Sequence, residues 1–133
     1  MRRVRDFVRA HGGGVVATNS GTGCPESAWI NLAALDDGRL VFGTNERSRK
    51  YGNLLADPRV SLVVVSGDGQ EFQLEGEASV LEGSAARDAG ELLEARHPGA
   101  TGKASTRLVA VRPHWARFVD VAAEPPVRED LTL

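Results

Sequence analysis

Residues 40–65 read LVFGTNERSRKYGNLLADPRVSLVVV, and they place a short helix between two apolar strands. Leu40 to Thr44 has the residue types of a strand, whereas from Asn45 to Asp57 the apolar side chains recur at helical spacing. Pro58 ends this helix, because a proline drives the residue before it out of helical geometry. The mainly β-branched run from Val60 to Val65 then predicts a buried strand.

The chain before this stretch predicts a helix and a hairpin. Apolar residues at helical spacing run from Arg2 to Ala10, and a run of three glycines ends that helix. A short apolar strand from Val15 to Thr18 follows, and Ala28 to Leu35 predicts the next one. The turn Asp36-Asp37-Gly38 joins it to the following strand, since Asp-Gly favours the positive φ of a tight hairpin.

The chain after residue 65 continues with a strand and a helix. Apolar and polar residues alternate strictly from Glu71 to Val80, which predicts a strand with one face toward the core. Phe72 and Leu74 lie on that core face. A helix with Ser84 as its N-cap is expected next, ending near His97.

The last predicted strand runs from Thr106 to Val121 and bends at Pro113. It completes about six strands that do not alternate with long helices, which argues against a parallel sheet and favours a small antiparallel barrel. We therefore expect a mainly β (α+β) fold with short flanking helices, in one domain over residues 1–133. The tail from Glu124 to Leu133 is expected to be loose or bound to a partner.

Composition excludes several classes of function. Sixteen basic residues face eighteen acidic ones, and this net charge of −2 argues against broad nucleic-acid binding. A single cysteine, Cys24, cannot form an intramolecular disulfide, so we expect a cytoplasmic protein. No apolar run approaches the roughly 20 residues of a membrane span, and no membrane association is expected.

The candidate binding motif is Ser48-Arg49-Lys50, which places a hydroxyl and two cations at the first turn of the predicted helix. Cations are unfavourable there because the helix dipole is positive at that end. An anion, and a phosphate above all, would relieve the repulsion and accept the free N–H groups. The alternative is an ordinary exposed basic turn, which is common in proteins.

Residues 40–65 resemble the flavin-binding core of the pyridoxamine-phosphate-oxidase-like proteins, and Gly76-Glu77-Ala78 resembles that family's Gly-x-Ala. The resemblance implies a split β-barrel with Greek-key character. It also implies a homodimer that holds FMN between its subunits. The family residues that match Arg49 and Lys50 hold the FMN phosphate, and the residue that matches Thr44 lies beside it on the strand.

The chain departs from the family pattern on the strand over residues 28–33, where the family has an Arg and a Lys and this chain has no basic residue. Glu71 stands nearest to a family glutamine. Main-chain contacts and Trp29 or Asn31 are the candidates to compensate. The alternatives to FMN are a deazaflavin cofactor, FAD, haem, or a site that has lost its ligand.

Trp115 is a further candidate, because the family often has an aromatic residue near the flavin on the last strand. A bound flavin would carry out two-electron redox of a small molecule, and no side chain is assigned a catalytic role. The segment 112–117 does not match the C-terminal substrate segment of true pyridoxamine-phosphate oxidase, so that activity is not expected. The three histidines have no ligand spacing, so no metal site is expected.

Overall fold

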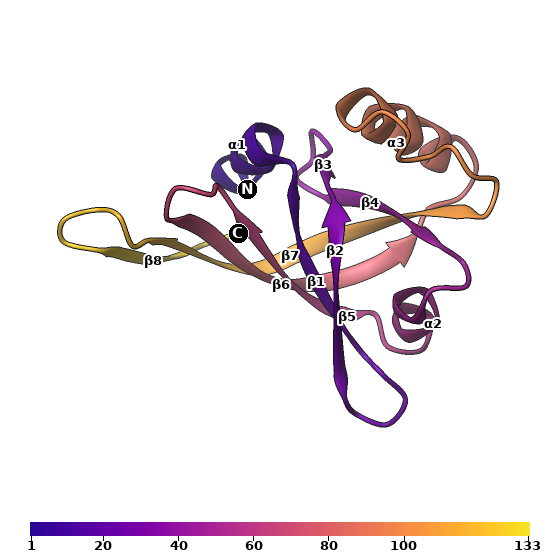
Figure 1. The fold of residues 1–133 in the computed structure, drawn as a ribbon, viewed down its shortest axis with the longest axis horizontal. Helices are drawn as coiled ribbons and strands as arrows, with labels where there is room; N and C mark the ends of the chain where they lie inside the picture. Colours follow the sequence, from indigo (N-terminus) through magenta and orange to yellow (C-terminus); the bar gives the residue numbers. More distant parts are fainter.

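A computed structural model describes residues 1–133 as an antiparallel sheet curled into a half-barrel with three helices (Figure 1). The elements in chain order are α1 (Arg2–His11), β1 (Gly13–Asn19), β2 (Pro25–Asn31), β3 (Ala33–Ala34), β4 (Leu40–Asn45), α2 (Arg49–Ala56), β5 (Arg59–Val65), β6 (Gln70–Val80), α3 (Gly83–Arg96), β7 (Thr106–Asp120) and β8 (Val127–Leu131). None of the helices is long and apolar enough to cross a bilayer.

The strand order is β2-β1-β5-β6-β7-β4-β3, with β8 paired to the other part of β7. At two places, strands that are neighbours in the sheet are far apart in the chain: β1 pairs with β5, and β7 pairs with β4. These two long-range pairings give the sheet its Greek-key character, and the split-barrel fold predicted from the sequence is confirmed. The β1–β2 and β7–β8 hairpins project from the rest of the molecule (Figure 1).

The structure has eight strands where about six were expected, and one reason lies at Leu32. Its N–H donates to the carbonyl oxygen of Gly12 over 2.9 Å, so the ladder with β1 ends there. The single strand expected over residues 28–35 is therefore two strands, β2 and β3.

The other additional strand is β8, in the segment that was expected to be loose or bound to a partner. Residues 127–131 pair with residues 116–120 of β7, and Arg117 Nε lies 2.6 Å from Asp130 Oδ1. The segment is thus attached to its own sheet rather than loose. Its side chains remain largely exposed, and contact with a partner stays a prediction.

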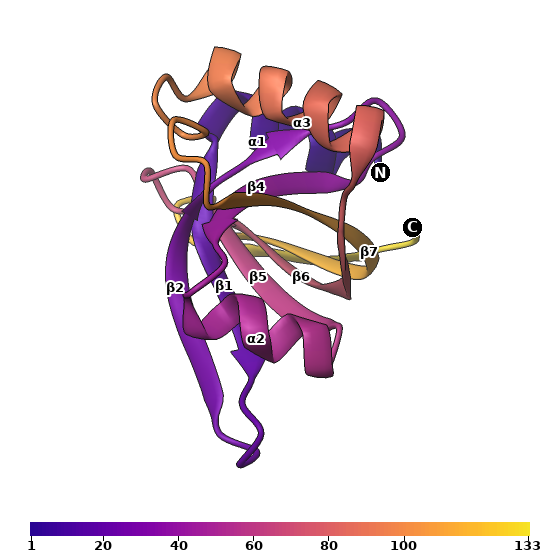
Figure 2. The same ribbon diagram turned by 90° about the vertical axis from the view of Figure 1, so that its right-hand side faces the viewer.

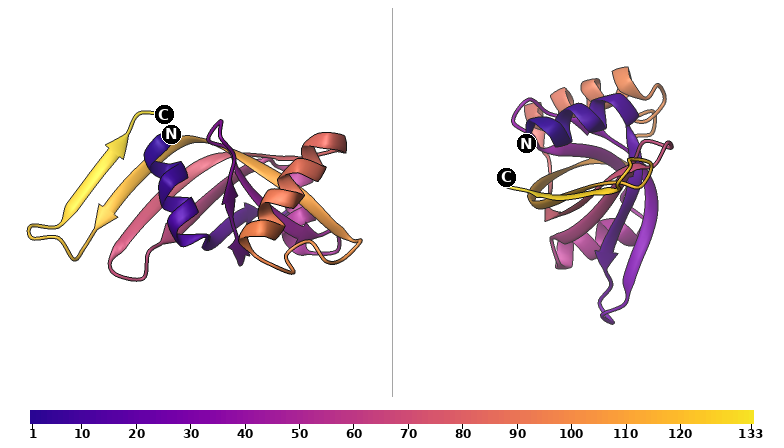
Figure 3. Two further views of the ribbon diagram at one scale, coloured as in Figure 1. Left: turned by 90° about the horizontal axis from the view of Figure 1, so that it is seen from above. Right: turned by 90° about the vertical axis from the view of Figure 1, so that its left-hand side faces the viewer.

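The core lies inside the half-barrel, and strand β6 shows how alternation builds it. Phe72 and Leu74 are 2% and 1% exposed, which confirms that this face of β6 points inward. Phe7 of α1 packs edge-on against Phe72, with 5.0 Å between ring centroids. Helices α1 and α3 lie on one side of the sheet strands, and α2 lies across the other end (Figures 2 and 3).

Pro113 marks a β-bulge, as the predicted bend suggests. Glu75 is in register with Trp115 whereas Gly76 is in register with Pro113, so His114 is the extra residue on β7. Proline has no N–H to give to the ladder, and such residues are tolerated at bulges. Gly76 is needed opposite, because a β-carbon there would clash with the backbone carbonyl of Arg112.

Two helices begin elsewhere than expected. Helix α2 starts at Arg49, because the side chain of Asn45 accepts the N–H of Arg47 over 2.8 Å and holds residues 45–48 in a turn. Helix α3 begins at Gly83, so Ser84 lies inside its first turn and does not cap it.

Candidate functional site

The candidate site forms where strand β4 turns into helix α2. Ser48 is the N-cap of α2, and its hydroxyl accepts the backbone N–H of Tyr51. The Thr44 hydroxyl lies 2.8 Å from that of Ser48, and Thr44 itself is 4% exposed. Thr44 therefore fixes the position of Ser48 from within β4.

A cavity of about 180 Å³ opens beside this helix start. It is lined by Ser48, Arg49 and Lys50 of α2, by Thr18 of β1, and by residues 26–28 of β2. The contacts of α2 with β1 and β2 set its position, and Figure 2 shows the helix next to both strands. The cavity thus combines a basic helix turn with an edge strand of the sheet.

Glu26 of β2 reaches into this cavity and contacts both turns of α2. Arg49 Nη1 donates to Glu26 Oε2 over 2.8 Å, and Asn53 Nδ2 donates to Glu26 Oε1 over 2.8 Å. Asn53 Nδ2 also lies 3.0 Å from Thr18 Oγ1. The carboxylate of Glu26 is therefore held by donors at both of its oxygens.

Lys50 differs from Arg49 in having no acidic partner. No ion pair of the structure includes Lys50, and burial lowers the pKa of its ammonium group below the ordinary lysine value. Arg49 is paired and its side chain is 73% exposed. Lys50 is thus the one cation of the cavity whose charge no carboxylate neutralises.

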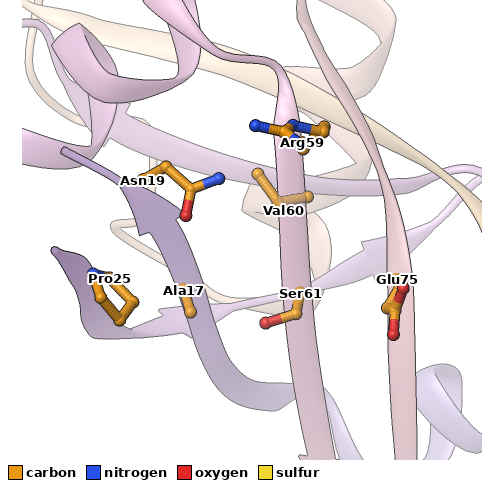
Figure 4. Close-up of a pocket in the computed structure, with 7 residues that line it drawn as sticks. All are labelled: Ala17, Asn19, Pro25, Arg59, Val60, Ser61 and Glu75. Carbon is orange, nitrogen blue, oxygen red and sulfur yellow. The ribbon is translucent and has the colours of Figure 1, made fainter. Parts of the chain in front are cut away.

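The outer face of the sheet carries two further hollows. One has a volume of about 220 Å³ and lies between β1 and β5, with Pro25 and Glu75 on its two flanks (Figure 4). The other, of about 330 Å³, lies between β1, β5 and β6 and includes Trp115. No helix of the chain covers this face in the three turned views (Figures 2 and 3).

Strand register places apolar side chains on this outer face. One row across the sheet consists of Trp29, Val15, Val63, Gln73 and Arg117. The next row consists of Ser27, Ala17, Ser61, Glu75 and Trp115. Trp29 is 64% exposed and Val65, at the end of β5, is 43% exposed. We call these two rows together with Val65 the outer sheet face.

The structure brings together four of the eight candidate residues, namely Thr44, Ser48, Arg49 and Lys50. Of these, Thr44 acts through Ser48 and lines a different cavity, of about 240 Å³, under the loop after α3.

The remaining four candidates lie away from the cavity within one chain. Trp29 and Trp115 both belong to the outer sheet face but sit four strand spacings apart, which is roughly 19 Å. Asn31 and Glu71 lie toward the other end of their strands, in register with Gly13 and Val65 respectively. A single chain therefore does not join these residues to Arg49 and Lys50.

Glu26 and Asn53 are residues of the site that the sequence analysis missed. The sequence held a signal for Glu26, because it shares a strand face with Ala28 and Ile30 once the strand is extended back to Pro25. The predicted strand began at Ala28, which left Glu26 outside it. No feature of the sequence pointed to Asn53, since its role depends on the packing of α2 against β2.

Elsewhere, no three His, Cys, Asp or Glu side chains gather in a group that could hold a metal ion. Cys24 is exposed in the β1–β2 hairpin, and its sulfur contacts only the neighbouring carbonyl of Pro25 among hydrogen-bond partners.

Comparison by sequence gives one family. The model described as pyridoxamine 5′-phosphate oxidase matches residues 1–120. No curated protein matches the sequence significantly.

Comparison by structure gives relatives with different descriptions. The conserved hypothetical protein Rv2991 of Mycobacterium tuberculosis is 25% identical with a TM-score of 0.79, over 91% of this chain and 84% of that one. A heme binding protein of Mycobacterium smegmatis is 22% identical with a TM-score of 0.75, over 97% of this chain and 56% of that one. A protein described as F420 reductase is 21% identical with a TM-score of 0.68, over 84% of this chain and 94% of that one.

Proposed function

Because the chain belongs to the pyridoxamine 5′-phosphate oxidase family, we propose that it is a flavin-binding oxidoreductase that works as a homodimer. The observation that carries the proposal is the cavity at the start of α2, which has the donors a cofactor phosphate requires. Ser48, Arg49 and Lys50 line it together, and the first turn of α2 contains no acidic residue. Family membership and this cavity support each other, since the family binds a flavin phosphate with the matching residues.

These residues fit an anionic group of the cofactor. The ammonium of Lys50 has no carboxylate partner, and the Arg49 guanidinium can turn because it is largely exposed. Charge-assisted hydrogen bonds from such groups to phosphate are about twice as strong as neutral ones. Arg49, Lys50 and the capped start of α2 would hold the phosphate, and Thr44 would keep Ser48 in place.

The second subunit of the proposed homodimer would cover the outer sheet face. Apolar patches larger than a few hundred Å² are rare on monomers, and here Trp29 and Val65 are exposed and Val63 is half-buried on a face that no helix covers. A twofold dimer would bring this face of one chain against the same face of its partner. Candidates that one chain keeps apart, such as Trp115 and the basic turn at Arg49, could then meet across the interface.

A bound flavin supplies the redox chemistry, which is two-electron transfer to or from a small molecule. The residues of this chain bind and orient the cofactor and exclude water from it. No side chain needs to act as a nucleophile.

A second candidate function is suggested by the structural relatives and by Glu26. The relatives include proteins described as an F420 reductase and as a heme binding protein. Glu26 pairs with Arg49 and reduces the positive charge available to a phosphate. A deazaflavin reductase of the same fold, or a protein that binds flavin or haem without catalysis, would tolerate this reduction.

The test of the proposed function is titration with FMN and with riboflavin, which lacks the phosphate. Arg49→Ala/Lys50→Ala removes two charge-assisted contacts of about 1.5 to 3 kcal/mol each, so we expect FMN affinity to fall by two or more orders of magnitude. Riboflavin affinity should be unchanged, because riboflavin makes no contact through a phosphate. Fluorescence quenching of the flavin measures both.

The matched control is Arg2→Ala/Arg47→Ala, which removes two positive charges that line none of the cavity and should leave FMN affinity unchanged. Equal FMN affinity in wild type and Arg49→Ala/Lys50→Ala would overturn the phosphate site. Wild type that binds neither flavin would overturn the proposal and favour the second candidate.

A further inference from the structure

Glu26 occupies the place in the cavity where an anion would bind. Its carboxylate accepts Arg49 at one oxygen and Asn53 at the other, each over 2.8 Å. The side chain of Glu26 is 21% exposed, so most of this contact lies inside the cavity. Strand β2 therefore contributes a fixed negative charge to the cavity.

The position of Glu26 is set by the surrounding residues. Asn53, in the second turn of α2, donates both to Glu26 and to the hydroxyl of Thr18. Thr18 is 1% exposed and therefore well fixed on β1. Glu26 thus has a defined contact from each side, unlike a surface carboxylate that moves freely in solvent.

The net charge of the cavity residues determines which ligand charge they can balance. Arg49 and Lys50 are positive and Glu26 is negative, which leaves one positive charge. A phosphate monoester at neutral pH carries a charge of about −1.5 to −2, whereas a phosphodiester or a carboxylate carries −1. Glu26 repels a doubly charged monoester about twice as strongly as a singly charged anion, and only the singly charged anion leaves the cavity neutral.

We infer that Glu26 is an internal counter-ion that makes this cavity select a singly charged oxyanion, such as a phosphodiester, over a phosphate monoester. In naming the ligand class of that cavity, the inference rests on the proposed function. It predicts that the flavin held here is joined to the protein through a singly charged group, and that FMN binds more weakly than the basic turn alone would allow.

The experiment uses small anions, so that it does not depend on the flavin. Methyl phosphate and dimethyl phosphate are titrated separately into the full chain at a pH where the monoester is doubly charged, and the amide shifts of Ser48, Arg49 and Lys50 are followed by NMR. In wild type, dimethyl phosphate should bind at least as tightly as methyl phosphate. In Glu26→Gln, the affinity for methyl phosphate should rise about tenfold, since one adjacent like charge is removed, and dimethyl phosphate should gain less.

Glutamine keeps the length of the side chain and an oxygen for Asn53, so Glu26→Gln changes mainly the charge. Glu77→Gln is the matched control, because Glu77 is exposed on β6, lines no part of the cavity and joins no ion pair. Its two affinities should equal those of wild type. Glu26→Ala provides a second variant, which should shift the preference in the same direction if charge is the cause.

Wild type that prefers the monoester, or a preference that Glu26→Gln and Glu26→Ala leave unchanged, would overturn the inference. FMN and riboflavin are then titrated into the same proteins. If the small anions follow the expected pattern while neither flavin binds, the charge selection stands and the proposed function fails. If FMN binds to wild type but gains nothing in Glu26→Gln, the proposed function stands and the selection is wrong.

Discussion

Lys50 carries the one positive charge of the cavity that no carboxylate balances, and its burial changes the pKa of that ammonium group. Desolvation lowers the pKa of the ammonium group from its ordinary value of 10.5. Lys50 therefore loses its proton at a pH where exposed lysines still keep theirs. A bound anion favours the protonated form, so binding and protonation of Lys50 are coupled.

This coupling predicts a pH dependence of FMN binding. As pH rises through the lowered pKa of Lys50, the cation is lost and FMN affinity should fall, whereas riboflavin affinity should not follow. The two affinities are measured from neutral to alkaline pH and expressed as a ratio. Taking the ratio removes the effect of flavin-ring ionisation, because both ligands carry the same ring. In Lys50→Arg the ratio should stay flat, because arginine remains protonated throughout. A flat ratio in wild type would show that Lys50 does not contact the phosphate.

At the scale of the elements, alternation in β6 determines which side chains form the core. Phe72 lies between Phe7 of α1 and Phe118 of β7, with ring centroids 5.0 and 5.2 Å away. It therefore joins a helix and two strands at one point. Exposed residues such as Ser79, on the same strand, make no comparable contact.

Truncation of Phe72 should accordingly be costly. Phe72→Ala removes a fully buried ring and leaves a cavity, so the free energy of unfolding should fall by about 3 to 5 kcal/mol. Ser79→Ala, at an exposed position, should change it by less than about 0.5 kcal/mol. Urea unfolding at one fixed protein concentration measures both. A loss under about 1 kcal/mol for Phe72→Ala would contradict the observed packing.

The same elements show what the sequence could predict. Strands β5 and β6 were located to within one residue, because their pattern depends only on local alternation. The break at Leu32 was not predictable, since it depends on a hydrogen bond that Leu32 donates to a residue 20 positions earlier. In the site, the basic turn was found from its motif. Glu26 was missed because its role depends on where β2 begins and on how α2 packs against it.

At the scale of the whole molecule, the half-barrel leaves the outer sheet face open and keeps the candidate residues apart. Arg49 and Lys50 lie at the start of α2, whereas Trp115 lies on β7 across the sheet. One chain offers a cavity of about 180 Å³ at the start of α2, which is too small to enclose a whole flavin. A second copy would supply the missing wall, so cofactor binding and dimer formation should occur together.

The most direct test of this account is sedimentation velocity of the wild-type chain with FMN, followed at the blue absorption band of the flavin. The account predicts that the flavin absorbance sediments with a species of twice the 14.2 kDa chain mass. Flavin absorbance that travels with a 14.2 kDa monomer would contradict the shared site. Absorbance that does not sediment with the protein at all would contradict flavin binding itself.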